Sequence, residues 1–363
     1  MISHISSAKN LNFIEIKKGN KMKKLLFILF LATVFCGCSK KETLHIYTWS
    51  DYLDPDFIAK FEKENNCKIV IDTFDSNETM YAKLKAGAAG YDICFPTEYF
   101  IPLLKNENII EELDLSKLPN VKNNIDRRFC KHDNSLKYYI PYAFSYTGIL
   151  YRKDKFPNVM IRRWNDIFEM NKYARISMFD DIREVIGLSL KSNGFSVNSI
   201  NQNEIDIATK TAYKWKQSVV KMDNESYKNE IANGGIDFAM GYNADAIQLM
   251  VEMGDEIGFV VPTVDGTTSS MDTITILKTS NKKDLAYKFI NALYERETAV
   301  KNSEYICAPM PIQNLTNYLS DTFKNNEYMY ISDELLKRCK TIEDVGSNLM
   351  LYNKAWDKIK SIK

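Results

Sequence analysis

The chain has 363 residues, of which 48 are basic and 47 acidic, giving a formal net charge of +1. This balance leaves no basic excess to follow a phosphate backbone, so it argues against nucleic acid as a partner. The length is sufficient for two domains of ordinary size, each able to bury its own hydrophobic core.

Residues 1–37 are typical of an export signal. Lys23 and Lys24 supply a positive start, and the apolar run 25–31 is too short to cross a membrane as a helix. Because Met22 directly precedes the basic pair, residues 1–21 can be an upstream extension of the true start. Removal of residues 1–37 takes away six lysines and one glutamate and leaves a net charge of −4, which mildly favours a cationic ligand.

The segment 35–38, Phe-Cys-Gly-Cys, is typical of a relaxed lipobox, in which a small residue precedes the cysteine that receives the lipid. Cys38 is therefore the expected lipidated N-terminus, and residues 38–43 form a polar tether. The location implied is the periplasm, with the protein anchored to a membrane by its N-terminal lipid. The alternative is an ordinary signal peptide with a chance cysteine.

The first hundred residues after the tether alternate strand and helix. Strands are expected at 44–47, 68–74 and 91–96, with one helix between each pair. Asp54-Pro55 is typical of an N-cap and first helical residue, Asn65-Asn66 can close that helix, and Ser76 opens the second. This alternation predicts a parallel sheet with right-handed crossovers.

The alternation continues after an aromatic segment, 138–142, which can pass from one domain to the other. The expected elements are strands at 175–179, 238–242 and 273–277 and helices from Asp181, over 205–220 and over 283–294. No repeat, low-complexity tract or Pro-rich linker separates the two halves. Two interleaved lobes therefore fit the sequence better than two successive domains.

Two turns in this pattern combine aromatic and acidic residues. The strand at 44–47 runs into Thr48–Tyr52, and the strand at 91–96 runs into Thr97–Tyr99. In an open α/β sheet the carboxyl ends of neighbouring strands converge on one crevice, so we expect both turns to face the same ligand. Aromatic faces with carboxylates suit an organic cation.

Several segments in order resemble the spermidine/putrescine-binding proteins of bacterial ABC importers. The resemblance extends over nearly the whole mature chain, and the run from Ser76 to Lys85 is its most specific part. The segments that carry it are Trp49–Tyr52, Ser76–Lys85, Tyr91–Ile93, Pro96–Tyr99, Asp180–Glu184 and Met271-Asp272.

The resemblance implies an α/β, two-lobed periplasmic-binding-protein-like type II fold with a ligand cleft between the lobes. Residues 44–141 with 271–312 are expected to form lobe 1, and 142–270 with 313–363 lobe 2. It further implies a monomer that binds spermidine or putrescine without a cofactor and delivers it to an ABC permease. The sequence contains no P-loop, so any ATPase that drives the transport is expected on a separate chain.

The resemblance also implies a ligand site. Carried over residue by residue, it gives aromatic walls and polar or acidic partners at Trp49, Asp51, Tyr52, Thr97, Tyr99, Asp181, Glu184, Tyr242 and Asp272. Tyr242 stands where the family usually has Trp. Ser270 and Ala308 replace a Trp and a Tyr of the best-known spermidine binders, and Ile342 falls near a usual Gln. Glu98 and Asp245 are additional acids near contact positions.

These residues also have structural explanations. Asp181 and Glu184 have the i, i+3 spacing of a helix N-cap and its reciprocal acid. Trp49 and Tyr52 can be core aromatics, and Asp272, directly before a β-branched strand, can be a solvated strand end. These structural roles alone do not make a polyamine site, because each ammonium group of the ligand must be paired with a carboxylate when the cleft closes.

Two alternative functions share these features. Paired carboxylates with aromatic platforms are also typical of a glycosidase, with Asp181 and Asp272 as the acids. A lipid-anchored polyamine receptor without transport would differ only in its partner. No G-x-S-x-G or H-E-x-x-H motif supports an enzyme, and no CxxC pair or His spacing supports a metal site. With Cys38 lipidated, the five remaining cysteines cannot all pair, and Cys67 and Cys94 are expected in the core.

Overall fold

The computed structural model describes residues 41–87, 90–130 and 133–361. The expected export signal, its upstream extension, Cys38 and most of the tether lie outside these residues. Within them, none of the helices combines the length and the apolar character that crossing a membrane requires.

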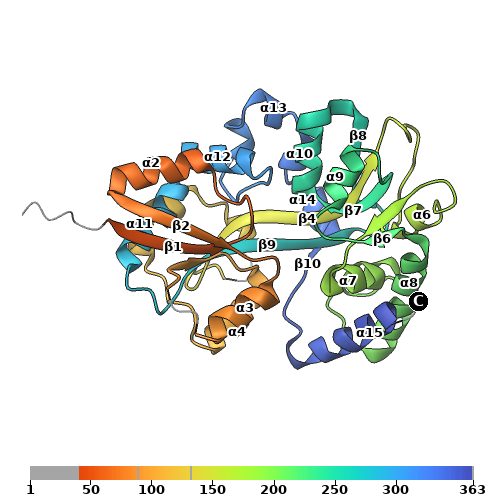
Figure 1. The fold of residues 1–363 in the computed structure, drawn as a ribbon, viewed down its shortest axis with the longest axis horizontal. Helices are drawn as coiled ribbons and strands as arrows, with labels where there is room; N and C mark the ends of the chain where they lie inside the picture. Colours follow the sequence, from red (N-terminus) through yellow and green to blue (C-terminus); the bar gives the residue numbers. More distant parts are fainter. Residues whose placement is uncertain (1–40, 88–89, 131–132, 362–363) are drawn as a thin grey trace, which may run out of the picture. The chain divides into compact units, whose positions relative to one another are not determined.

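The strands form a mixed sheet with the order β2-β1-β3-β9-β4-β7-β5-β6, to which β10 adds beside β9 and β8 beside β4 (Figure 1). The bounds are β1 Glu42–Thr48, β2 Cys67–Thr73, β3 Ile93–Cys94, β4 Ile140–Arg152, β5 Ile176–Met178, β6 Lys221–Met222, β7 Phe238–Tyr242, β8 Ile257–Val260, β9 Thr267–Ile276 and β10 Cys339–Thr341.

The bounds of the α-helices are α2 Pro55–Asn65, α3 Asn77–Lys85, α4 Ile101–Asn106, α5 Pro119–Asn124, α6 Trp164–Phe168, α7 Ile182–Ser192, α8 Gln202–Ser218, α9 Tyr227–Ala232, α10 Asn243–Met253, α11 Lys283–Leu293, α12 Arg296–Tyr305, α13 Asp321–Lys324, α14 Asp333–Arg338 and α15 Leu349–Ser361. The helices α2, α3, α7, α8 and α11 lie where the sequence predicts helices, whereas the others, including α10, α12 and α15, were not predicted.

The predicted caps of the first two helices are confirmed. The Asp54 side chain accepts from the N–H of Asp56 at the start of α2, and Asn66 ends that helix in the left-handed conformation with φ 47°. The Ser76 side chain accepts from the N–H of Thr79 at the start of α3. Each cap satisfies backbone groups that would otherwise lack a partner at a helix end.

β1 and β3 are parallel, with Ile46 opposite Ile93, as the sequence predicts. Beyond β3 the sheet changes direction, because β9 pairs antiparallel with β3 and again with β4. The prediction of a strand starting at Thr273 was wrong in its bounds, since β9 begins at Thr267. Asp272 is therefore inside a strand and not before one: the preceding Thr and Ser residues pair along β4 and β10.

β4 and β9 lie side by side along most of β9 (Figure 1). The segment of β4 from Ile140 to Tyr146 pairs with β9, and the segment from Thr147 onward pairs with β7. The same strand contributes Tyr142 and Ala143 to one hydrophobic core and Phe144 onward to a second. β4 therefore joins two separate cores through a single unbroken strand.

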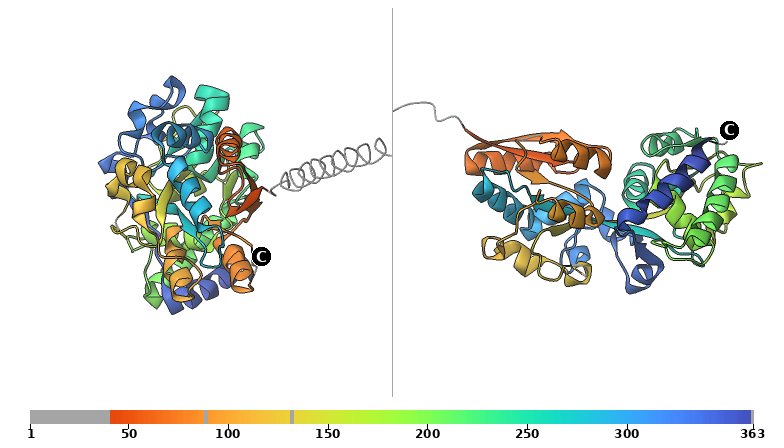
Figure 2. Two further views of the ribbon diagram at one scale, coloured as in Figure 1. Left: turned by 90° about the vertical axis from the view of Figure 1, so that its left-hand side faces the viewer. Right: turned by 90° about the horizontal axis from the view of Figure 1, so that it is seen from below.

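The two cores are formed by different parts of the chain. The first contains residues of β1, α2, α11 and α12, and it also includes Leu315, Leu319 and Met329. The second contains residues of α7, α8, β7 and β8, and from Ile331 it includes the C-terminal residues. In Figure 2 the last helix, α15, in dark blue, lies beside the green helices α7 and α8. The residue boundaries of the two lobes stay a prediction.

Cys67 and Cys94 are buried, as predicted, with exposed fractions of 2% and 0%. Cys67 lies in the first core, and Cys94 lies in a third, smaller cluster with Tyr47 and Phe74. Among the described residues, Cys94, Cys130, Cys307 and Cys339 are free thiols.

Candidate functional site

The turns after β1 and β3 meet at one carboxylate, that of Asp272 in β9. Tyr52 donates its hydroxyl hydrogen to Asp272 Oδ2 over 2.5 Å, and Thr97 donates to Oδ1 over 2.7 Å. Thr97 also forms an antiparallel bridge with Asp272. The two turns therefore converge, as the order of strands in the sequence predicts.

Asp272 is buried without a positive partner. Its side chain is held by two neutral hydroxyl groups, and within the described residues no lysine or arginine forms an ion pair with it. Burial raises the pKa of Asp272 above its ordinary value, and the hydrogen bonds from Tyr52 and Thr97 lower it in part. A buried carboxylate of this kind is poorly compensated and is stabilised by an incoming cation.

A second pair of acids lies at the start of α7. Asp181 is the N-cap of this helix, and its Oδ1 accepts from the backbone N–H groups of Arg183 at 2.8 Å and Glu184 at 2.9 Å. Burial raises the pKa of Asp181, and these backbone hydrogen bonds oppose the rise. The capping explanation of Asp181 is thus observed, and it leaves the second carboxylate oxygen for another partner.

Glu184 does not complete a capping box. Its Oε2 accepts from the hydroxyls of Thr147 in β4, at 2.9 Å, and Thr268 in β9, at 2.6 Å. The side chain is buried, and this burial, with the charge of Asp181, raises the pKa of Glu184 to about 7. Glu184 is therefore attached to the same two strands that join the cores.

The two acid centres lie along one face of β9. Thr268, Ser270 and Asp272 occupy every second position of β9, so their side chains point to the same side of the strand. A rise of 3.2–3.4 Å per residue places the Cα atoms of Thr268 and Asp272 about 13 Å apart. Ser270, which is half-buried, lies between them. The carboxylates of Glu184 and Asp272 are held at opposite ends of this row.

The predicted aromatic residues are half-buried and pack on neighbouring rings. Trp49 contacts Phe74 with ring centroids 4.4 Å apart, and Tyr242 stacks on Phe179 at 4.6 Å. Trp49 Nε1 is buried, and among the described residues it has no hydrogen-bond partner. These rings therefore serve the packing of each lobe, while part of each surface remains accessible.

The charges of the α7 acids act on two of the predicted rings. Burial raises the pKa of Tyr242, and the charges of Glu184 and Asp181 raise it further. Burial also raises the pKa of Tyr99, followed by the charges of Glu78 and Asp181. Tyr99, from the turn after β3, is thus close enough to α7 to sense its acids.

Other predicted residues are not joined to this network by any described hydrogen bond. Asp51 is exposed and has φ 53°, and Cys38 lies outside the described residues. The additional acids are engaged elsewhere: Glu98 accepts from the Tyr139 hydroxyl, and Asp245 accepts from Tyr227 and pairs with Lys228. Ala308 and Ile342 are buried, with exposed fractions of 2% and 5%.

Sequence reasoning missed three residues that hold the site. Thr147 and Thr268 are two of them, because their hydroxyls donate hydrogen bonds to Glu184. Asn77, in the segment Ser76–Lys85, is the third, because its side chain forms two hydrogen bonds with Thr97. A buried polar residue at the start of a helix is the signal that could have identified Asn77.

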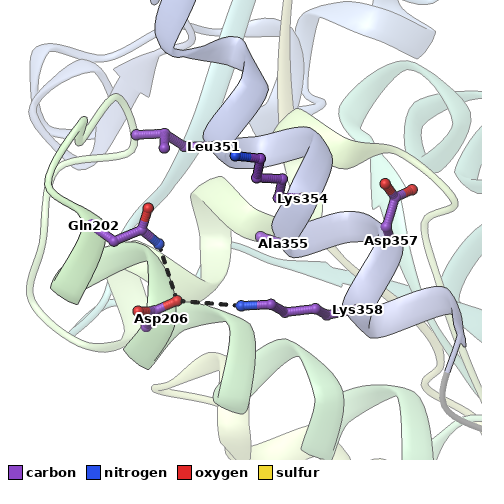
Figure 3. Close-up of a pocket in the computed structure, with 7 residues that line it drawn as sticks. All are labelled: Gln202, Asp206, Leu351, Lys354, Ala355, Asp357 and Lys358. Atoms are coloured by element: carbon purple, nitrogen blue, oxygen red, sulfur yellow. Dashed lines mark hydrogen bonds and ion pairs between the residues drawn. The ribbon is translucent and has the colours of Figure 1, made fainter.

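A pocket of about 500 Å³ lies away from these residues, between α8 and α15 (Figure 3). Its lining is mostly charged or polar, and Asp206 accepts from Gln202 at 3.1 Å and pairs with Lys358 at 3.8 Å. None of the predicted site residues lines it. Two aspartates and two lysines line it, so its charges balance and do not favour a cation.

Comparisons with known proteins identify the family of the chain. The model of the family "Bacterial extracellular solute-binding protein" matches residues 56–329. The spermidine/putrescine-binding periplasmic protein of Escherichia coli is 30% identical over 321 residues, covering 88% of this chain and 92% of that protein. The putrescine-binding periplasmic protein PotF of Escherichia coli is 30% identical, covering 92% and 96%.

A solved structure shows the same fold. The Tp0655 (TpPotD) lipoprotein of Treponema pallidum superposes with a TM-score of 0.80 at 32% identity, covering 88% of this chain and 99% of that one. This similarity confirms the predicted α/β, two-lobed type II fold.

Proposed function

The chain belongs to the bacterial extracellular solute-binding proteins, among the spermidine/putrescine-binding proteins of polyamine ABC importers, and from this premise we propose that it binds a polyamine and delivers it to an ABC permease. The observation that carries the proposal is the pair of buried acid centres along β9. Asp272 belongs to β9 itself, and Glu184 of α7 is hydrogen-bonded to Thr268 of β9. Each is held by hydroxyl groups and neither has a cationic partner among the described residues.

The spacing of the acid centres suits a ligand with two or more ammonium groups. Terminal nitrogens separated by nine single bonds, as in spermidine, lie about 11 Å apart when extended, and those of putrescine, separated by five, about 6 Å. The row along β9 is about 13 Å long. A triamine can therefore place an ammonium near each carboxylate, with its methylenes covered by the half-buried rings of Trp49, Tyr52, Tyr99 and Tyr242.

The proposed site residues divide by their roles. Asp272 and Glu184 pair with the outer ammonium groups, Asp181 adds a charge beside Glu184, and Thr97 and Tyr52 hold Asp272. Asp51 is the least supported of the predicted residues, because it is exposed and has no described contact with the others. We keep it as a rim residue of the site.

Ligand binding is proposed to close the two lobes by bending β4 and β9. Support comes from the two cores, since each of these strands contributes side chains to both. The proposed lobes are residues 44–141 with 271–312 and residues 142–270 with 313–363. Closure removes water from the carboxylates and so strengthens their attraction for the ammonium groups.

The protein is further proposed to be a monomer anchored at a membrane surface by a lipid on Cys38. The relative from Treponema pallidum is named a lipoprotein. Mass spectrometry of the membrane fraction is expected to find a diacylated Cys38 peptide. An unmodified peptide that starts elsewhere would contradict the anchor.

Calorimetry and thermal shift with spermidine, putrescine, lysine, arginine and a neutral disaccharide test the binding function. We expect a specific shift with the polyamines alone, larger for spermidine. Stabilisation by the sugar alone would favour the glycosidase alternative. Copurification of a permease separates an importer from a surface receptor.

A further inference from the structure

The start of α3 lies against the turn that follows β3. Asn77, the first residue of α3, is 5% exposed. Its Oδ1 accepts from the backbone N–H of Thr97 at 3.0 Å, and its Nδ2 donates to Thr97 Oγ1 at 2.9 Å. A longer contact of 3.4 Å reaches the Tyr99 hydroxyl. One buried amide thus holds two residues of the proposed ligand site.

The hydrogen-bond pattern assigns a direction to this network. A backbone N–H can only donate, so the Asn77 oxygen must face Thr97 N and the NH₂ group must face Thr97 Oγ1. The Thr97 hydroxyl then accepts from Asn77 and keeps its single hydrogen for Asp272 Oδ1, 2.7 Å away. Ionised Asp272 can only accept. The donors therefore run one way, from Asn77 through Thr97 to Asp272.

We propose that Asn77 is a positioning residue of the ligand site, which orients the Thr97 hydroxyl and thereby keeps both oxygens of Asp272 hydrogen-bonded in the ionised form. This inference rests on the proposed function, because it assigns a role within that site. It also gives a purpose to a residue in the segment Ser76–Lys85, none of whose members was expected to contact the ligand.

Removing the amide frees the Thr97 hydroxyl to rotate and leaves the backbone N–H of Thr97 without its partner. Asp272 then has one oriented donor, from Tyr52, in place of two. Since hydrogen bonds to a carboxylate favour its charged form, the ionised state of Asp272 is destabilised and cation binding weakens. The aromatic groups that also face Asp272 are Tyr52 and Tyr142, and neither supplies a compensating positive charge.

The first test compares Asn77→Ala with Ser76→Ala. Ser76 is the N-cap of the same helix but has no described contact with Thr97 or Tyr99, so its loss weakens α3 alone. We expect Asn77→Ala to weaken spermidine binding about tenfold and to move the acid limit of binding to higher pH. Ser76→Ala should lower the melting temperature with an unchanged Kd and pH profile. Equal effects of the two variants on Kd would overturn the inference.

A double-mutant cycle with Thr97→Val tests the route through Thr97. Valine keeps the volume of threonine and removes the hydroxyl. The single variant Thr97→Val can therefore still be measured if Asn77→Ala folds poorly. If Asn77 acts through this hydroxyl, adding Asn77→Ala to Thr97→Val should change Kd less than about twofold. Fully additive losses would show that Asn77 acts by another route and would contradict the proposal.

A ligand-free measurement separates this inference from the proposed function. The pKa of Asp272, followed by carboxyl carbon NMR, should be higher in both Asn77→Ala and Thr97→Val than in the wild type and unchanged in Ser76→Ala. An unaltered pKa in both variants overturns the positioning role whatever the ligand. A shifted pKa in a protein that binds no polyamine supports the positioning role and overturns the proposed function only.

Discussion

Tyr52 donates its hydroxyl hydrogen to Asp272 Oδ2 over 2.5 Å, although 220 positions separate the two residues in the sequence. The Tyr52 ring also packs against Tyr142 of β4, with centroids 5.2 Å apart. Through the Tyr52 side chain, the turn after β1 therefore contacts both β4 and β9. The hydrogen bonds from Tyr52 and Thr97 fix the orientation of the Asp272 carboxylate in the ligand-free protein. Less ordering of this side chain is therefore needed when a cation binds.

Asp272→Asn tests the charge of this carboxylate while preserving its shape. An ammonium left unpaired in a closed site should cost about 3–5 kcal/mol of binding free energy. Calorimetry with spermidine measures the loss, and Asp357→Asn, at an exposed position of α15, is the matched control, for which Kd should not change. Unchanged affinity in Asp272→Asn would remove this residue from the site.

Asp181→Asn separates helix capping from ligand contact. Asparagine caps helices as well as aspartate, so we expect the free energy of unfolding to change by only a few tenths of a kcal/mol. Spermidine affinity should still fall, about tenfold, because the charge is lost. Asp181→Ala should lose both affinity and about 1 kcal/mol of stability. If Asp181→Asn binds as tightly as the wild type, Asp181 is a cap and nothing more.

The raised pKa of Glu184 predicts that the stability of the ligand-free protein depends on pH. Burial, together with the charge of Asp181, raises its pKa from 4.5 to about 7 in the folded state. The folded chain therefore holds this proton more tightly than the unfolded chain. The resulting stability is complete below the unfolded pKa and is lost as pH rises through about 7, by about 3 kcal/mol in total. Urea denaturation at pH 5 and pH 8 measures this difference.

Glu184→Gln is expected to flatten this dependence and to make the ligand-free protein more stable at pH 8, since the amide oxygen can still accept from Thr147 and Thr268. The same variant should bind spermidine more weakly. In the wild type, affinity should rise between pH 5.5 and pH 8 by at most about tenfold per pH unit for this group, because the polyamine favours ionised Glu184. A pH-independent wild-type Kd would rule out Glu184 as the titrating group.

Ser270→Trp tests the space between the two acid centres. Ser270 lies between Thr268 and Asp272 on the same face of β9 and is half-buried. A ring at this position should cover the ligand methylenes and strengthen spermidine binding by about 0.5–2 kcal/mol. Ser226→Trp, at an exposed position, controls for added surface area. Weaker binding in Ser270→Trp would indicate that a bulkier or branched ligand occupies this space.

The sequence alone determined the elements whose causes are local. Caps such as Asp54 and Ser76, the apolar strand of β7 and the helical periodicity of α11 depend on residues within one or two turns, so their bounds were predicted within one residue. The convergence of the two aromatic and acidic turns also followed from the sequence, because strand order implies it.

Only the tertiary structure decided which partners each acid has. Asp272 and Glu184 are held by hydroxyls from residues tens to hundreds of positions away, and no local pattern specifies such pairs. The unbroken passage of β4 between the two cores, and the amide of Asn77 that orients Thr97, depend likewise on long-range packing. Local propensity fixes where a helix begins, whereas burial and hydrogen bonding between distant segments fix the charge that a side chain can carry.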